Sequence, residues 1–333
     1  MQKILVIQTA FIGDVVLVTA LLEDLHLQNP NAVLDILVRK GNETLFTAHP
    51  YLNEVLIWQK KENKYANLYK VIYQIQQNKY DRVINVQRFA ATGFITVLSG
   101  AKETIGFDKN PFSIFFTKRI KHIFSKGNIV LHEVERNFQL LENTTDAKAS
   151  KPKLYPSPID KAAIEGYTNQ PYICIAPASV WFTKQFPVSK WIAFLQVIPK
   201  NYSVYLLGAP SDIALCNEIA VALPDTNCSI LAGKLTFLES AALMEQAVMN
   251  YVNDSAPMHF ASAVNAPVTA IYCSTIPAFG YGPLSINSTI VEIEEPLACR
   301  PCGIHGKKAC PETHFNCAMK ITNEQLLASL RNE

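Results

Sequence analysis

The sequence has few charged residues and almost no charge bias. Charged side chains make up 17% of its 333 residues, and the formal net charge is +2. So small a basic excess leaves no electrostatic footprint for nucleic acid, and we expect no nucleic-acid partner. Hydrophobic residues make up 49%, which is enough for a sizeable core and excludes a disordered chain. The length favours two domains.

Long apolar runs are also missing. The apolar N-terminal segment is interrupted at Gly13 and Asp14, and the uncharged run that follows, residues 15–22, is too short to cross a bilayer. The segment lacks a small-residue cleavage site as well, so we interpret it as a buried strand, a turn and a helix. The expected location is the cytoplasm.

Two ligand-binding motifs are absent. Only Gly13 follows the first predicted strand, where a dinucleotide fingerprint needs G-x-G-x-x-G, and this argues against a nicotinamide-dependent epimerase or dehydrogenase. No Asp-x-Asp pair occurs, although metal-dependent sugar transferases of the single-domain kind usually need one. We therefore expect that no cofactor is required for catalysis, and that fixed dipoles and a lysine neutralise a leaving diphosphate.

The chain does contain two successive runs of alternating strands and helices. The first run has predicted strands at 4–7, 33–38, 55–57 and 82–86 and helices at 13–27 and 65–77. A polar, proline-rich linker is predicted at 145–158. The second run has strands at 172–176, 202–207, 249–253 and 267–272 and helices at 212–222 and 236–247. This pattern predicts an α/β fold of two Rossmann-like domains, residues 1–150 and 151–333, facing each other across a cleft.

In such folds, ligands bind beyond the carboxyl ends of the strands. Asp14 follows the first strand and lies in the first turn of the next helix, where the helix dipole favours its negative charge. A carboxylate there can take a proton from an attacking hydroxyl, or it can simply cap the helix.

Two strand ends in the second half carry groups suited to an anion. Lys184 can meet a phosphate while Ser179 and Thr183 supply hydroxyl donors, or it can be a solvated lysine. In the segment 254–259, a helix start with Pro257 in its first turn leaves backbone N–H groups for an anion. Asp254 would repel a phosphate, so we expect it to fix the loop. His259 can reach a ligand or be structural.

Together these segments resemble glycosyltransferase family 9, the ADP-heptose:lipopolysaccharide heptosyltransferases. The resemblance runs over nearly the whole chain with the motifs in the family's order. It rests on Ile12-Gly13-Asp14 with Thr19 and Leu22, the Pro-x-x-…-Thr-Lys-x-x-Pro segment at 177–187, the stretch 131–137, and Asp254-Ser255-Ala256-Pro257-Met258-His259.

The resemblance implies a GT-B fold and an inverting, metal-independent transfer. The first domain would bind a lipid-linked lipopolysaccharide-core acceptor and the second an ADP-sugar donor. The implied residue roles are catalytic base for Asp14, phosphate contact for Lys184, ribose contact for Asp212, and diphosphate loop for Ser255, Ala256 and His259. Ala256 replaces the family's usual glycine, and its methyl group narrows the approach of phosphates. A different nucleotide-sugar donor, or a non-catalytic nucleotide- or glycan-binding protein, is therefore the alternative.

Two features remain beside the resemblance. A compact cluster near the C-terminus can hold a structural zinc ion, line a loop as reduced thiols or form disulfides, and we expect it to lie away from the strand ends. Its members are Cys299, Cys302, Cys310 and Cys317. The basic stretch Lys118–His122 can make a peripheral contact with the inner membrane or be a solvated loop.

Overall fold

The computed structural model describes residues 1–142 and 148–330. The chain divides into two compact units, Met1–Tyr155 and Pro156–Glu333, and this division falls within the predicted linker segment. Residues 145–147 of that predicted linker lie outside the described residues.

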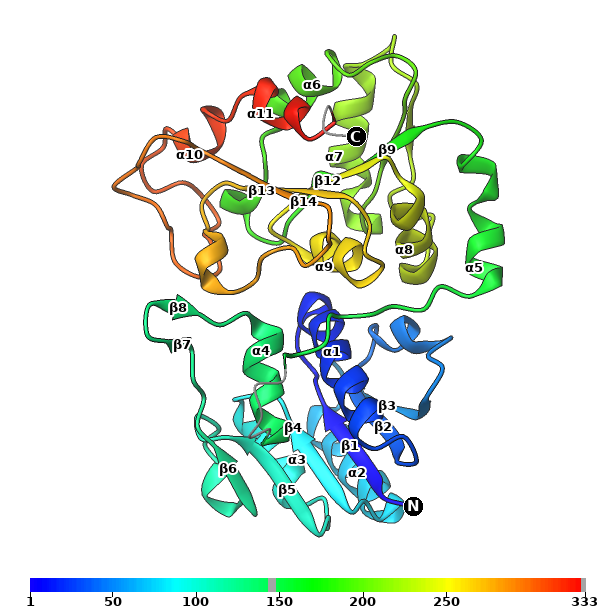
Figure 1. Ribbon diagram of the computed structural model, residues 1–333, viewed down its shortest axis with the longest axis vertical. Coiled ribbons are helices and arrows are strands. Elements are labelled where there is room, and N and C mark those ends of the chain that lie inside the picture. Colours follow the sequence, from blue (N-terminus) through cyan, green and yellow to red (C-terminus); the bar gives the residue numbers. More distant parts are fainter. Residues whose placement is uncertain (143–147, 331–333) are drawn as a thin grey trace. The chain divides into compact units, whose positions relative to one another are not determined.

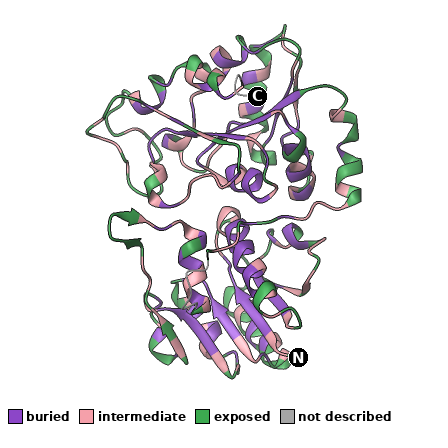
Figure 2. Cartoon of the chain, viewed as in Figure 1, coloured by how far each residue is buried: buried purple, intermediate pink, exposed green. Residues whose placement is uncertain are grey.

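Unit 1 is built on a six-stranded parallel sheet with the strand order β3-β2-β1-β4-β5-β6 (Figure 1). The apolar run of β1 lies at the centre of the sheet, and its residues from Ile4 to Ile7 are fully buried (Figure 2). The strands are β1 (Lys3–Ile7), β2 (Val33–Arg39), β3 (Leu52–Trp58), β4 (Arg82–Asn85), β5 (Glu103–Phe107) and β6 (Lys118–Ile120).

The helices of unit 1 are α1 (Ile12–Gln28), α2 (Lys64–Asn78), α3 (Ala90–Val97) and α4 (Glu133–Phe138). Helices α1, α2 and α3 each connect two consecutive strands of the parallel sheet, whereas α4 follows its last strand. The buried side chains of α2, Val71, Ile72 and Ile75, recur at helical spacing on one face. A separate antiparallel hairpin of β7 (Ser125–Lys126) and β8 (Ile129–Val130) precedes α4.

Unit 2 repeats the plan, with a parallel sheet in the order β11-β10-β9-β12-β13-β14. Its strands are β9 (Tyr172–Ala176), β10 (Ser203–Leu206), β11 (Cys228–Ile230), β12 (Met249–Asn253), β13 (Val268–Tyr272) and β14 (Ser288–Glu292). Its helices are α5 (Pro158–Ala163), α6 (Val188–Leu195), α7 (Ile213–Val221), α8 (Phe237–Gln246), α9 (Ala256–Ala263), α10 (Asn316–Met319) and α11 (Asn323–Ala328).

Both sheets have the Rossmann strand order, which confirms the predicted α/β class with two Rossmann-like units. Successive strands are added toward one edge of the sheet and then toward the other, and this order reverses between the parallel strands β1 and β4 in unit 1 and between β9 and β12 in unit 2. Ligands of such sheets bind at these reversal points, beyond the carboxyl ends of the strands. Asp14 follows β1, whereas Lys184 and Asp254 follow β9 and β12.

The strands missing from the sequence prediction include three edge strands, β6, β11 and β14. Strand β14, for example, has two exposed residues, two half-buried residues and one buried residue, so it lacks a continuous apolar run. Of the helices within residues 1–142 and 148–330, none combines the length and hydropathy needed to span a lipid bilayer.

Candidate active site

The loop after β9 is tied to the end of β12 by one amide side chain. Asn253 is fully buried; its Nδ2 donates to the Pro177 carbonyl at 2.8 Å, and its Oδ1 accepts from the Phe186 N–H at 2.9 Å. One side chain thus holds both ends of the loop that carries Lys184. Sequence reasoning missed Asn253, and the available signal was an amide at the last position of a buried strand.

Lys184 and Asp254 form an ion pair at this strand edge. The Lys184 Nζ lies 2.6 Å from the Asp254 Oδ2, and the Thr275 hydroxyl donates to the same oxygen at 2.6 Å. The side chains are only 15% and 10% exposed, so Lys184 is not a freely solvated surface lysine. Asp254 thus contacts the loop that carries Lys184, while its role in fixing that loop and its part in nucleotide-sugar binding remain predictions. The phosphate contact of Lys184 remains a prediction.

Thr183 anchors the same loop to Ser274 and to Lys307. Its residue surface is 1% exposed, and its Oγ1 accepts from the Lys307 N–H at 2.7 Å and from the Ser274 hydroxyl at 2.9 Å. The Thr183 N–H donates in turn to the Lys307 carbonyl at 3.1 Å. This burial does not support the predicted phosphate contact of Thr183. Ser179 is half-buried in the same loop, and its phosphate contact remains a prediction.

Thr183→Val should cost about 1–3 kcal/mol of unfolding free energy, because it leaves the Lys307 N–H and the Ser274 hydroxyl without their acceptor. Thr183→Ser keeps the oxygen and serves as the matched control. Denaturant unfolding measures the difference as a lower midpoint at an unchanged slope. Equal midpoints for the two variants would contradict the anchoring role.

The N-terminus of α9 faces the same strand edge. Ser255 occupies the N-cap position in extended backbone, and its side chain makes no capping hydrogen bond. Pro257 lies in the first turn, where its missing N–H has no cost. Ser255 and Ala256 are half-buried, and His259 is buried one turn later. A helix start of this kind is suited to an anion, but the diphosphate contacts of these residues remain predictions.

Asp212 lies beyond β10, the neighbour of β9, and its side chain closes the short turn that precedes α7. Its Oδ2 accepts from the Ala209 N–H at 2.8 Å, and its Oδ1 accepts from the Ser211 hydroxyl at 3.1 Å. A methyl group on Gly208 would come within 2.9 Å of the Asp212 Cβ, so this close approach needs glycine. Asp212 therefore lies on the predicted edge, and its ribose contact is still a prediction.

In unit 1, the Asp14 carboxyl lies in the first turn of α1 as predicted. The pKa of Asp14 is raised to about 6, chiefly by burial and also by the negative charge of Glu133, while hydrogen bonds from backbone N–H groups and the Arg39 charge oppose the rise. Glu133 is held by Arg136, whose Nε lies 2.8 Å from its Oε2. A carboxyl with a pKa this close to neutrality is suited to general-base work.

The sequence analysis missed two cations, Lys60 and Arg39, that lie beside the end of β1. Lys60 follows β3, and its Nζ donates to the Thr9 carbonyl at 2.7 Å. Burial, together with the Arg39 and Lys64 charges, lowers the pKa of Lys60 to about 8. The Arg39 guanidinium, at the end of β2, lies 5.1 Å from the Phe11 ring centroid. Neither residue belongs to a local motif, so only the parallel sheet brings them beside the β1 end.

The cysteine cluster does not lie away from the strand ends, and that expectation was wrong. The segment from 299 to 317 crosses the β9 and β13 ends, where the Cys302 N–H donates to the Ser274 carbonyl at 2.9 Å. A methyl group on Gly306 would lie 3.0 Å from both the Lys184 Cγ and the Thr183 Oγ1. The expectation failed because the chain that follows β14 returns to the ends of β9 and β13, and no local sequence pattern predicts that return.

The four cysteine thiols are free and line one cavity of about 150 Å³. Within the described ranges, no group of three or more His, Cys, Asp or Glu side chains is arranged to hold a metal ion. No disulfide joins these four cysteines, and the reduced-thiol and zinc interpretations both remain predictions.

Comparison with known proteins agrees with this geometry. The family description "Glycosyltransferase family 9 (heptosyltransferase)" matches residues 68–311. "Lipopolysaccharide heptosyltransferase 3" of Escherichia coli is 27% identical over 285 residues, covering 80% of this chain and 82% of that protein.

Two solved structures share the fold. The "ADP-heptose lps heptosyltransferase II" of E. coli superposes with a TM-score of 0.82 at 21% identity, covering 99% of this chain and 98% of the other. A family 9 glycosyl transferase from Veillonella parvula superposes with a TM-score of 0.87 at 21% identity, covering 100% and 98%. These likenesses identify the GT-B fold.

Proposed function

This chain belongs to glycosyltransferase family 9 and is a glycosyltransferase, and from that premise we propose that it moves a heptose from an ADP-linked donor onto a lipopolysaccharide-core acceptor. The observation that carries the donor side of the proposal is the buried ion pair of Lys184 and Asp254 at the β9–β12 reversal point. It presents an oriented ammonium group beside a helix N-terminus, where a diphosphate is stabilised.

The proposed reaction is an inverting displacement. Asp14 takes the proton of an acceptor hydroxyl, which attacks the anomeric carbon from the face opposite the nucleotide. The bond from that carbon to the diphosphate breaks, and the electron pair leaves with the nucleotide. Lys184 and the first turn of α9 stabilise the negative charge that develops on the leaving group.

The nucleotide is the part of this proposal most open to test. At 100 times its dissociation constant, ADP should add about 2.7 kcal/mol of stability, which corresponds to a rise in Tm of roughly 5 °C or more. A thermal-shift screen against ADP, UDP and GDP measures this. Stronger stabilisation by UDP or GDP would assign another donor, consistent with the alanine at position 256.

A second measurement separates a transferase from a binding protein. With the cognate nucleotide-sugar, release of nucleoside diphosphate should depend on added acceptor. Nucleotide binding without any such release, over a series of core acceptors, would favour the non-catalytic alternative.

A further inference from the structure

Residues 109–131 of unit 1, here called the basic–apolar segment, carry charge of one sign. The segment contains no Asp or Glu, although the chain has 28 acidic residues in 333. Its cations are Lys109, Lys118, Arg119, Lys121 and Lys126. The positive charge of this segment is therefore not balanced by its own sequence.

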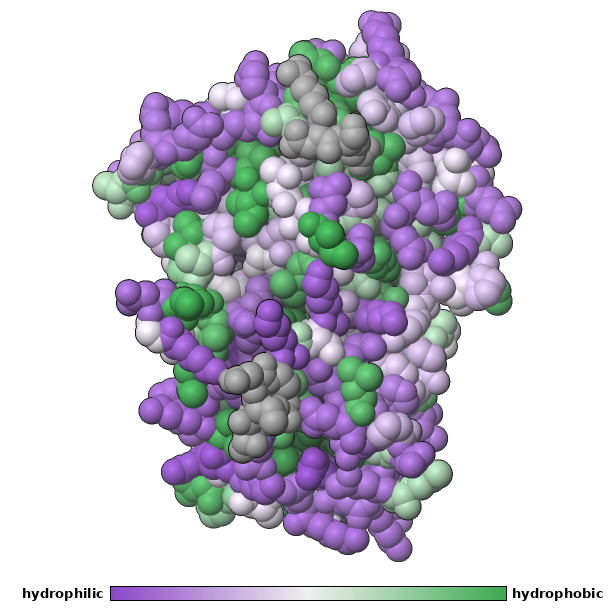
Figure 3. All heavy atoms as spheres, in the orientation of Figure 1, coloured by the Kyte–Doolittle hydropathy of each residue, from purple (hydrophilic) through white to green (hydrophobic). Residues whose placement is uncertain are grey.

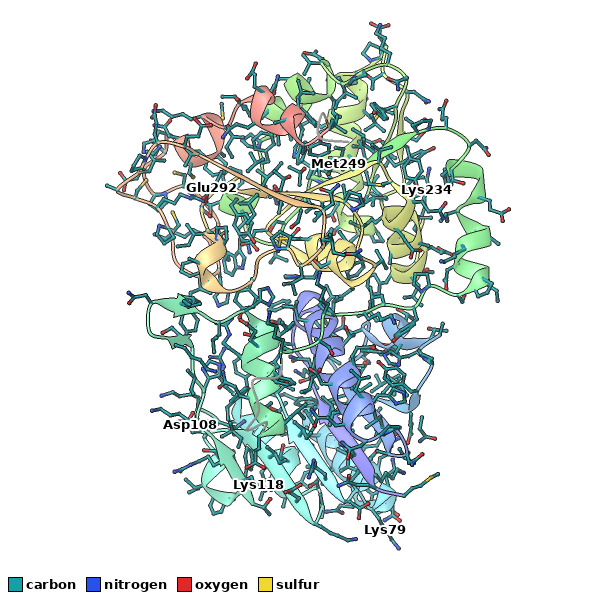
Figure 4. The ribbon with its side chains drawn as sticks, in the orientation of Figure 1. Lys79, Asp108, Lys118, Lys234, Met249 and Glu292 are labelled. Carbon is teal, nitrogen blue, oxygen red and sulfur yellow. The ribbon has the colours of Figure 1, made fainter. Side chains whose placement is uncertain are left out.

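Most of that charge is free to meet a partner. Lys109, Arg119, Lys121 and Lys126 are exposed, and none of the four forms an ion pair with a described residue. Lys118, on β6 (Figure 4), is different, because it bridges two carboxylates at the sheet edge.

The stretch 118–122 therefore offers less free positive charge to a membrane than its sequence implies. Lys118 lies 2.8 Å from a Glu103 oxygen and 2.6 Å from a Glu142 oxygen. Burial, with nearby arginine charges, lowers the pKa of His122 to about 4, so the imidazole is neutral at physiological pH. The available cations extend instead to both sides of this stretch.

The same segment exposes large apolar side chains. Ile114, Phe115 and Ile129 are 68%, 63% and 72% exposed. Ile129 belongs to the β7–β8 hairpin, which stands apart from the six-stranded sheet (Figure 1) and shows hydrophobic beside hydrophilic surface (Figure 3). Large exposed apolar side chains that share a segment with unpaired cations are typical of an interaction site.

We propose that the basic–apolar segment docks unit 1 onto the surface of an anionic lipid bilayer. Apolar side chains would enter the interfacial region while lysine and arginine meet the headgroups, as in other interfacial elements. The positive charge of the segment favours an anionic lipid surface over self-association, because a second copy of the same segment would bring like charges together. The inference deepens the proposed function, on which it rests, since a lipid-linked acceptor lies in such a surface.

Vesicle co-sedimentation tests the surface directly. The wild-type chain should pellet with phosphatidylcholine vesicles containing about one third phosphatidylglycerol, and much less with phosphatidylcholine alone. The triple variant R119Q/K121Q/K126Q should partition about 100-fold more weakly, because each cation near an anionic surface contributes roughly a factor of five. The variant K151Q/K200Q/K234Q removes three other exposed lysines and the same net charge, and it should bind like the wild type.

A second variant, I114S/F115S, tests the apolar contribution and should also weaken the binding. Equal partitioning of R119Q/K121Q/K126Q and its control, or equal binding of the wild type to neutral vesicles, would overturn the docking surface. Pelleting without vesicles would assign the face to self-association and also overturn it. ADP-induced stabilisation should be unchanged in every variant, so failure here is distinguishable from failure of the transferase proposal.

Discussion

Asp14→Asn should lower kcat by at least roughly 10²-fold while nucleotide affinity stays within about twofold of the wild type. The amide keeps the size of the side chain at the start of α1 but cannot accept the acceptor's proton. Steady-state transfer assays and calorimetric titration with ADP measure the two quantities. Turnover near the wild-type value would remove Asp14 from the base role.

The same substitution should stabilise the fold at neutral pH. The folded pKa of Asp14, about 6, lies above its ordinary value of 3.8. The folded state therefore binds more protons than the unfolded state between these values, and stability falls as pH rises from about 4 to about 6. Asp14→Asn removes a penalty on the order of 1–3 kcal/mol at pH 7. Denaturant unfolding should show this gain at pH 7 and not below about pH 4.

The pH profile supplies a further check on the role of Asp14. Because the base must be ionised, kcat/KM should fall as pH drops through about 6.

Asp24→Asn is the matched control for Asp14→Asn, since Asp24 lies at the far end of α1 and accepts from the Ser150 hydroxyl at 2.6 Å. Its kcat should remain within about twofold of the wild type. An equal loss in both variants would indicate damage to α1 rather than loss of a base.

Lys184→Met should weaken ADP binding by roughly 10- to 100-fold, because a hydrogen bond to a charged phosphate is worth about 1.5–3 kcal/mol. The substitution also leaves the Asp254 carboxylate, 10% exposed, without its cation and facing an anionic ligand. Calorimetry with ADP and with adenosine separates the phosphate contribution. Adenosine affinity should stay unchanged, and an equal loss for both ligands would contradict the assignment.

A double-mutant cycle isolates the ion pair. Lys184→Met combined with Asp254→Asn should bind ADP more tightly than Lys184→Met alone, because the unpaired carboxylate is gone. Lys190→Met, on the neighbouring helix α6, is the control and should bind ADP like the wild type. Strict additivity of the two substitutions would mean that Asp254 does not orient Lys184.

Local sequence pattern was sufficient for much of the architecture. Apolar runs located the central strands β1, β9 and β12, and helical spacing located α1 and α2 to within one residue at each end. The edge strand β14 was missed because half-exposed residues interrupt its apolar pattern. The positions of Asp14, Lys184 and Asp254 after their strands followed from the same pattern.

The sequence by itself determined the α/β class, the strand-end position of each candidate residue and the family motifs, because these depend on neighbours along the chain. Only the tertiary structure decided that Asp254 holds Lys184, that Asn253 and Lys307 fix the loop beneath them, and that Lys60 reaches the β1 end. The physical reason is distance along the chain: parallel strands joined by crossovers place residues tens to more than a hundred positions apart in hydrogen-bond contact, and no local periodicity records those pairings.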